Sequence, residues 1–158
     1  MILVFDLDDT LYDESTYVKS SFKAVARYLS QKYSLTETGI LENIIQVFNE
    51  KGRGHIFDVV LKKYNVYTIL EVKNCVSVYR KNTPQIKLFN EARDVLEILS
   101  GYPKYLVSDG NKLVQSIKIN ALGINKYFKK IILTHRYGIK HIKPSTYCFN
   151  IIKKTEKC

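Results

Sequence analysis

The sequence has no apolar run approaching the ~20 residues that a membrane-spanning helix requires, so we expect no membrane partner. No basic leader precedes Asp6 in the N-terminal run MILVFDLDD, which argues against a secretory signal peptide. Cysteine is scarce as well: Cys75, Cys148 and Cys158 are odd in number and unrelated in spacing. They indicate free thiols in a reducing compartment rather than a disulfide or metal framework, and we therefore expect a cytoplasmic protein.

Acidic side chains are nearly missing from the last third of the chain. Residues 101–158 contain twelve Lys and Arg but only Asp109 and Glu156, whereas thirteen basic side chains balance thirteen acidic ones in residues 1–100. The net charge of +10 therefore lies in the last third. A basic face can bind nucleic acid, but the tyrosines lie at apolar positions and do not alternate with basic residues as a base-stacking platform requires. We expect a region that handles phosphate and no nucleic-acid partner.

Short apolar runs alternate with segments of helical periodicity along the chain. Consecutive apolar residues predict buried strands at 2–5, 105–107 and 130–133. Apolar residues recur at helical spacing in seven segments, which predicts helices at 15–33, 37–50, 55–64, 69–79, 90–99, 113–122 and 146–154. Because the strands are connected by helices, the order predicts an α/β fold with a parallel sheet.

The four helical segments that follow the first strand predict a small helical bundle inserted into the α/β pattern. Thr83-Pro84 ends that bundle, so the predicted domains are a core of residues 1–13 and 84–158 and a helical insertion of residues 14–83. In such sheets, ligands bind beyond the carboxyl ends of the strands. The acids after Phe5 and the polar turn after Val107 are both predicted to lie there.

Asp6, Asp8 and Thr10 form the pattern D-x-D-x-T directly after the first predicted strand. Two carboxylates at this spacing can divide the work of phosphoryl transfer: one attacks phosphorus, and the other passes protons to the leaving group and later activates water. Several negative groups brought together require a cation, and Mg²⁺ prefers oxygen ligands. The alternative is an acidic turn that caps a helix, with Asp9 or Asp13 as the cap.

Two further polar positions follow the second and third predicted strands. Ser108 opens the turn Ser-Asp-Gly-Asn, whose hydroxyl and N–H groups could hold a phosphate, although taken by itself the turn is better explained as a simple turn and helix cap. Lys143 precedes Pro144 and could neutralise both a nucleophilic carboxylate and phosphoryl oxygens. Lys140 is its rival, and the proline decides for Lys143. Arg53, between Gly52 and Gly54, is predicted to lie in an interhelical loop.

FDLDDTLY, LVSDGN and IKPS resemble the first three motifs of the haloacid dehalogenase superfamily of phosphohydrolases. LVQSIKINALGINKYF is similar to the segment that follows the second motif in the phosphatase branch, and the bundle at 14–82 lies where that branch carries a helical cap. The resemblance covers nearly the whole chain. It implies a Rossmann-like core, an inserted α-helical cap and a Mg²⁺ cofactor.

The resemblance also implies roles for individual residues. Asp6 would be the nucleophile that forms an aspartyl-phosphate, and Asp8 the general acid/base whose backbone carbonyl binds the metal together with Asp6. Lys143 would stabilise charge, and Ser108 would bind phosphate. The predicted substrate-binding residues are Ser108, Thr10, Asp109 and Gly110. An acid at the position of Asp8 favours a phosphatase, because the true dehalogenases of the superfamily lack one.

One part of the family pattern has no counterpart in this sequence. The family's fourth motif, an acidic strand end of the type G-D-x-x-x-D, completes the metal site, but Glu156 is the only acid after Asp109. The missing strand would lie beside the first one, which predicts Val4 and Phe5 at an exposed sheet edge and an incomplete core. Three interpretations stay open: a fragment of a longer phosphatase, a shortened protein whose acids come from a partner such as a second copy in a homodimer, or a non-catalytic member.

The sequence therefore predicts a Mg²⁺-dependent phosphomonoester hydrolase that acts on a small phosphorylated metabolite. The alternative is a truncated or degenerate module that binds a ligand or another protein without catalysis.

Overall fold

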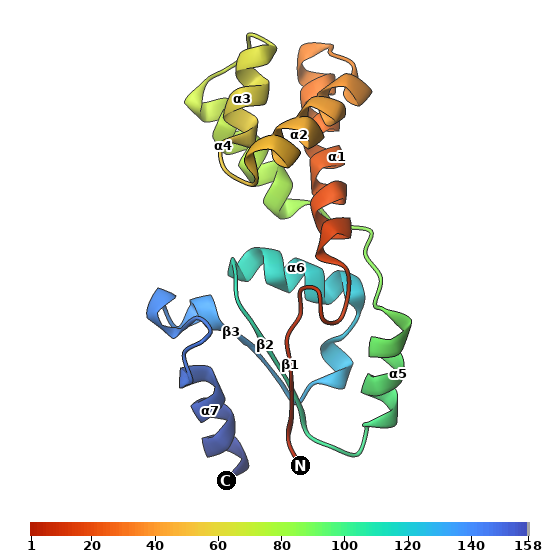
Figure 1. Ribbon diagram of the computed structural model, residues 1–158, viewed down its shortest axis with the longest axis vertical. Helices are drawn as coiled ribbons and strands as arrows, with labels where there is room; N and C mark the ends of the chain where they lie inside the picture. The colour runs from red at the N-terminus through yellow and green to blue at the C-terminus, as the bar shows by residue number, and fades with distance from the viewer. Residues whose placement is uncertain (158) are drawn as a thin grey trace. The chain divides into compact units, whose positions relative to one another are not determined.

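The computed structural model describes residues 1–157, which divide into two compact units (Figure 1). The first, here called the α/β unit, comprises Met1–Thr16 and the chain from Thr83 onward. The second, the helical unit, comprises Tyr17–Asn82. Each unit has its own buried core.

The α/β unit is built on a three-stranded parallel sheet, as predicted. Its strands are β1 (Leu3–Phe5), β2 (Lys104–Ser108) and β3 (Lys130–Leu133), in the spatial order β1-β2-β3. Val4 is in register with Tyr105, and Leu106 with Ile131. Since all three strands run the same way, their carboxyl ends meet at one edge of the sheet, where the predicted site residues follow.

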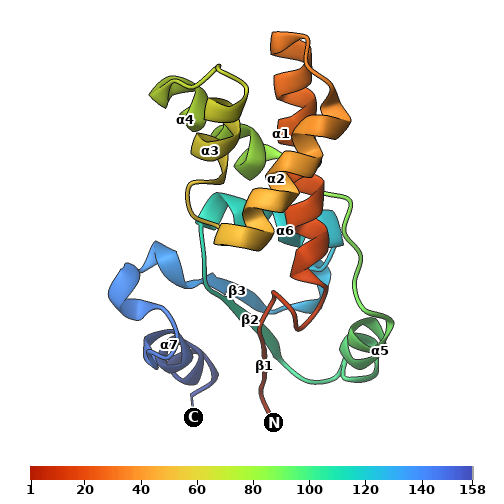
Figure 2. The same ribbon diagram turned by 45° about the horizontal axis from the view of Figure 1, so that its top comes forward.

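Helices cover both faces of this sheet. Helix α7 (Tyr147–Glu156) lies on one side, and α5 (Asn90–Ile98) and α6 (Lys112–Leu122) lie on the other (Figures 1 and 2). Short 3₁₀ turns connect them at η1 (Asn125–Tyr127), η2 (Thr134–Arg136) and η3 (Ile139–His141). On the α7 side, a buried cluster joins alternate residues of β2 to β3 and α7, and its members are Tyr105, Val107, Ile132, Cys148 and Ile152. The alternation is that of a strand between two helical layers.

The ends of α6 follow from local chemistry. The side chain of Asn111 accepts hydrogen bonds from the backbone N–H groups of Leu113 at 3.0 Å and Val114 at 3.4 Å, which caps the amino end. Gly123 ends the helix in the left-handed conformation with φ of 65°. These two caps fix α6 directly after β2, so its first turns lie close to the carboxyl edge of the sheet.

Strand β1 is an edge strand of the described sheet, as the sequence predicted. The N–H of Leu3 donates to the carbonyl of Pro103 at 3.0 Å, on the β2 side. Because successive residues of a strand alternate in direction, the N–H and C=O of Val4 face away from β2. The Val4 side chain is 40% exposed, so this edge is open within residues 1–157.

The helical unit contains most of α1 (Glu14–Tyr33) together with α2 (Glu37–Lys51), α3 (Ile56–Lys63) and α4 (Ile69–Lys81), close to the predicted segments. Its core is apolar apart from Ser21 and Glu71. Glu71 accepts hydrogen bonds from Lys32 at 2.5 Å and from the Tyr28 hydroxyl at 2.7 Å. Burial raises the pKa of Glu71, but these hydrogen bonds outweigh it and hold the pKa below its usual value. The ionised carboxylate therefore ties α4 to α1.

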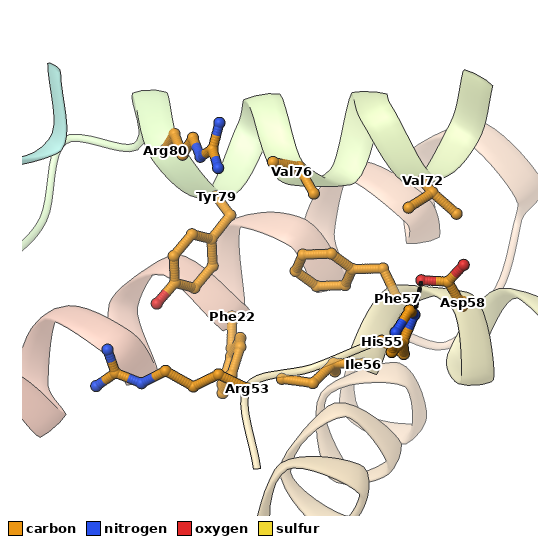
Figure 3. Close-up of a pocket in the computed structure, with 10 residues that line it drawn as sticks. All are labelled: Phe22, Arg53, His55, Ile56, Phe57, Asp58, Val72, Val76, Tyr79 and Arg80. Atoms are coloured by element: carbon orange, nitrogen blue, oxygen red, sulfur yellow. Dashed lines mark ion pairs between the residues drawn. The ribbon is translucent and has the colours of Figure 1, made fainter. Parts of the chain in front are cut away.

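A pocket of about 250 Å³ lies within the helical unit (Figure 3). Its apolar wall comes from α1, α3 and α4, with Phe57 pointing into it. Arg53 and Arg80 lie at one end, and the ion pair of His55 with Asp58, at 3.7 Å, lies at the other. The predicted loop at Arg53 is thus part of the pocket's lining.

Two of the three cysteines confirm the prediction of free thiols. Cys75 and Cys148 are unpaired and buried, and burial raises the pKa of the Cys75 thiol to about 12. Cys158 lies outside the described residues. Within residues 1–157, no helix is both long and apolar enough to cross a membrane.

Candidate active site

The loop after β1 is anchored by apolar side chains that alternate with its acids. Leu7 and Leu11 are fully buried or nearly so, and the carbonyl of Leu7 accepts the N–H of Leu11 at 3.0 Å. Asp6 and Asp8 flank Leu7 just after the carboxyl end of β1, and both are partly exposed. The sequence V-F-D-L-D therefore fixes the two acids through the burial of the residue between them.

The neighbouring acids cap the following helix, as the alternative interpretation of this turn required. Asp9 accepts the N–H of Glu14 at 2.9 Å, and Asp13 accepts the N–H of Ser15 at 2.8 Å. Carboxylates at a helix amino end are stabilised by the unpaired N–H groups there. The acidic run thus has two functions: Asp9 and Asp13 start α1, whereas Asp6 and Asp8 lie at the edge of the sheet.

Lys143 reaches the first of these carboxylates. Its Nζ lies 2.5 Å from Oδ1 of Asp6 and 3.5 Å from the carbonyl of Val107. The rival Lys140 lies in η3 and is exposed. An ammonium at this position opposes the charge of a carboxylate on a neighbouring strand end.

Asp109 fixes the segment that carries Lys143. Its Oδ1 accepts the hydroxyl of Thr134 at 2.5 Å, and its two oxygens lie 3.3 and 3.2 Å from the N–H of Lys143. Thr134 is fully buried directly after β3. The carboxylate predicted to bind substrate is therefore occupied by the protein's own donors, and it connects the end of β2 to the Lys143 segment.

Asp8 is surrounded by hydrogen-bond donors. Oδ1 accepts the Tyr12 hydroxyl at 2.6 Å and Lys118 Nζ at 2.7 Å, and Oδ2 accepts Gln115 Nε2 at 2.7 Å. Burial raises the pKa of this carboxyl, but the bonds from Lys118, Tyr12 and Gln115 and the charge of Lys118 outweigh it, so the pKa lies below its usual value. Asp8 is therefore ionised at neutral pH.

The remaining predicted residues differ in how close they come to the acids. Ser108 is buried, and its Oγ lies 2.8 Å from Gln115 Nε2, next to Asp8. Gly110 has φ of 111°, which residues with a side chain rarely adopt, and a Cβ added there would lie 3.4 Å from Gln115 Nε2. Thr10 is exposed, and its hydroxyl makes no hydrogen bond to the other predicted site residues among those described.

Gln115 and Lys118 were not predicted as site residues. Both lie on α6, are 2% exposed, and contact Asp8 directly. Their spacing of three residues, which places them on one face of a helix, was the available signal. It was hidden because Lys118 is one of twelve basic residues in the last third.

The described residues match Mg²⁺ in the type of donor but not in number. One Asp6 oxygen is bound by Lys143, and both Asp8 carboxylate oxygens are taken by protein donors. Within residues 1–157, no three His, Cys, Asp or Glu side chains are grouped to hold a metal. The second Asp6 oxygen and backbone carbonyls of the loop are the oxygen donors left for a hard cation.

Comparison with known families identifies the chain. The family model of haloacid dehalogenase-like hydrolases matches residues 3–158, nearly the entire sequence. The chain belongs to this family. The family that the first three motifs led us to expect is thereby confirmed.

Curated relatives of the chain are phosphatases. It is 25% identical over 152 residues to a glyceraldehyde 3-phosphate phosphatase of Methanothermobacter thermautotrophicus, and 26% identical over 153 residues to one of Pyrococcus abyssi. Each alignment covers 92% of this chain but only 66% and 64% of the relatives. The chain thus spans about two thirds of their length.

Solved structures agree with the fold. A hydrolase of this superfamily from Geobacter sulfurreducens superposes with a TM-score of 0.65 at 12% identity, covering 99% of this chain and 72% of the other. A family member from Bacillus subtilis, determined with magnesium bound, superposes with a TM-score of 0.59 at 21% identity, covering 98% and 71%. These similarities support the predicted Rossmann-like α/β core.

Replacing Asp109 by alanine is expected to release the Lys143 segment. The Thr134 hydroxyl would be buried without its partner, which costs about 1–3 kcal/mol of unfolding free energy in urea. Hydrogen exchange of the Lys143 amide should accelerate, whereas Asp94→Ala at an exposed position of α5 should change neither quantity. Unchanged protection of the Lys143 amide in Asp109→Ala would show that Asp109 does not hold the segment.

The stability contributed by Asp8 should depend on pH. Its folded pKa lies below the unfolded value of about 3.9, so the stabilisation is present above that value and is lost as the pH falls through the folded pKa. Asp8→Asn should therefore unfold about 2 kcal/mol more easily than the wild type at pH 7. The difference should shrink toward pH 2.5 in urea titrations. A difference that stays constant from pH 7 to pH 2.5 would contradict this.

Proposed function

We propose that the chain is the catalytic part of a phosphomonoesterase that forms an aspartyl-phosphate on Asp6. The observation that carries the proposal is the approach of Lys143 Nζ to Asp6 Oδ1 at 2.5 Å, with Asp8 and Ser108 on the same edge of the sheet. A nucleophile, a second carboxylate, a hydroxyl and an ammonium at converging strand ends suit attack on a phosphate monoester.

In the proposed first step, a carboxylate oxygen of Asp6 attacks phosphorus and the bond from phosphorus to the leaving oxygen breaks. The small fraction of Asp8 that is protonated at neutral pH gives the leaving oxygen its proton, and Lys143 offsets the negative charge on Asp6 and the phosphoryl oxygens. In the second step, Asp8 accepts a proton from water, and the resulting hydroxide attacks phosphorus. Asp6 is released as a carboxylate, and inorganic phosphate leaves.

We also propose Mg²⁺ as the cofactor. The second Asp6 oxygen and the backbone carbonyl of Asp8 would contribute to holding it, with ligands from outside the described residues completing the set. When bound, the cation would offset charge on the transferred phosphoryl group.

For the substrate, we propose a small phosphorylated metabolite, with triose and sugar phosphates as the first class to test. The support is the substrate named for the curated relatives, at 25–26% identity. The helical unit is proposed to select among such substrates as a cap, because it is inserted at the place in the sequence where the phosphatase branch carries one.

A non-catalytic binding module is the second candidate function. It is favoured by one observation, namely that residues 1–157 offer no group of three metal-binding side chains. A module of this kind would hold a phosphorylated ligand through Ser108 and Lys143 without turning it over.

Phosphate release decides between the two functions. Incubated with p-nitrophenyl phosphate or glyceraldehyde 3-phosphate and Mg²⁺, the wild-type chain should release inorganic phosphate, and a chelator should abolish the release. Asp6→Asn should lower the rate at least about 1000-fold, because it removes the nucleophile. Asp94→Asn, on the exposed face of α5, is the matched control. Absence of phosphate release by the wild type at high protein concentration would contradict the enzyme proposal and favour the binding module.

A further inference from the structure

A glutamine and a lysine of α6 converge on the second acid of the loop after β1. Gln115 and Lys118 contact opposite oxygens of the Asp8 carboxylate, each at 2.7 Å. We propose that they are positioning residues that fix the direction of the Asp8 carboxylate for proton transfer. The inference rests on the proposed function, in which Asp8 is the general acid/base.

Lys118 is almost completely buried, which is rare for a lysine. Its side chain is only 3% exposed, and Nζ bridges Asp8 Oδ1 at 2.7 Å and Glu14 Oε1 at 3.4 Å. Removing an ammonium from water costs several kcal/mol, and an apolar side chain of the same size often serves stability as well as or better than a buried ion pair. Stability alone therefore gives little reason for a buried lysine here, whereas orientation of a reacting carboxylate does.

Gln115 connects Asp8 to the loop after β2. Its Nε2 lies 2.7 Å from Asp8 Oδ2, 2.8 Å from Ser108 Oγ and 2.6 Å from the Asp109 carbonyl. One amide group thus joins the acid of the first loop to the predicted phosphate-binding turn of the second. The amide's other end, Oε1, is buried and lacks a hydrogen-bond partner among the described residues, so the side chain is oriented by its nitrogen alone.

The geometry leaves the Asp8 carboxylate little freedom to rotate. With Tyr12 on Oδ1 as a third donor, both oxygens are fixed from two sides, by the loop itself and by α6. Displacement of a reacting group by about 1 Å can cost about 100-fold in rate. Lys118 also offsets the charge of Asp8, as Lys143 offsets that of Asp6, so each acid of the pair has its own lysine.

The kinetic test compares leaving groups. Lys118→Met keeps the stem but removes the charge, and it should lower kcat on an alkyl phosphate such as glyceraldehyde 3-phosphate by about 100-fold. On p-nitrophenyl phosphate, whose leaving group departs without a proton, the loss should stay below about 10-fold, and KM should change little. Asp8→Asn should show the same selectivity, and the double variant should be no slower than Asp8→Asn alone. Lys112→Met, exposed at the start of α6, is the control.

Equal losses of kcat on both substrates, additive losses in the double variant, or an unaffected Lys118→Met would each overturn the inference. Gln115→Glu offers a second variant of almost unchanged size. It places a negative charge against Asp8 and the Asp109 carbonyl, and the alkyl-selective loss should be at least as large. A Gln115→Glu protein with wild-type kcat on both substrates would overturn the role of Gln115.

A measurement that needs no turnover separates this inference from the proposed function. If the wild type releases no phosphate, the proposed function fails. The ¹³Cγ resonance of Asp8 then tests whether Lys118 and Gln115 act on its carboxylate. That resonance should move in Lys118→Met and Gln115→Glu and stay in place in Lys112→Met. An unmoved resonance in both α6 variants would overturn the inference.

Discussion

Two carboxylates two residues apart on one tight loop repel each other, and the α/β unit is arranged around that repulsion. Lys143 binds Asp6 at 2.5 Å, and Lys118 binds Asp8 at 2.7 Å. Lys118 lies on α6, before β3 in the sequence, and Lys143 lies after β3, so neither acid is neutralised by its own loop. Contacts between chain segments more than a hundred residues apart therefore stabilise the acidic loop.

The parallel sheet makes this meeting of segments possible. Its three carboxyl ends carry Asp6, Ser108 and Thr134 to one edge, and the cross-connections run along that edge. Asp109 holds the Lys143 segment, and Gln115 joins Asp8 to the turn after β2. The site is thus a network of charge-assisted hydrogen bonds on a rigid base, which suits a reaction that needs fixed geometry.

The sequence was informative wherever the signal was local. The strands and helices were predicted from the periodicity of apolar residues, and the capping of α1 by Asp9 and Asp13 from the chemistry of the turn before it. The position of Lys143 could be expected from the adjacent Pro144 and the family motif. The burial of Lys118 against Asp8 could not be predicted, because the sequence does not distinguish a buried lysine from a solvated one in so basic a segment.

Asp109 shows the converse limit. Its position in the turn after β2 was foreseen, but its partners Thr134 and the Lys143 N–H come from beyond β3 and depend on tertiary structure. The same holds for the pocket of the helical unit, whose lining comes from three helices and a loop.

The central claim is that Asp6 is the residue that accepts the phosphoryl group, and direct trapping of the acyl phosphate tests it. The protein is mixed with substrate, quenched in acid and reduced with borohydride, which converts a phosphorylated aspartate into homoserine. Peptide mass spectrometry should then find the conversion at Asp6 in the wild type and nowhere in Asp6→Asn. Conversion at another aspartate, or phosphate release without any conversion, would contradict the account.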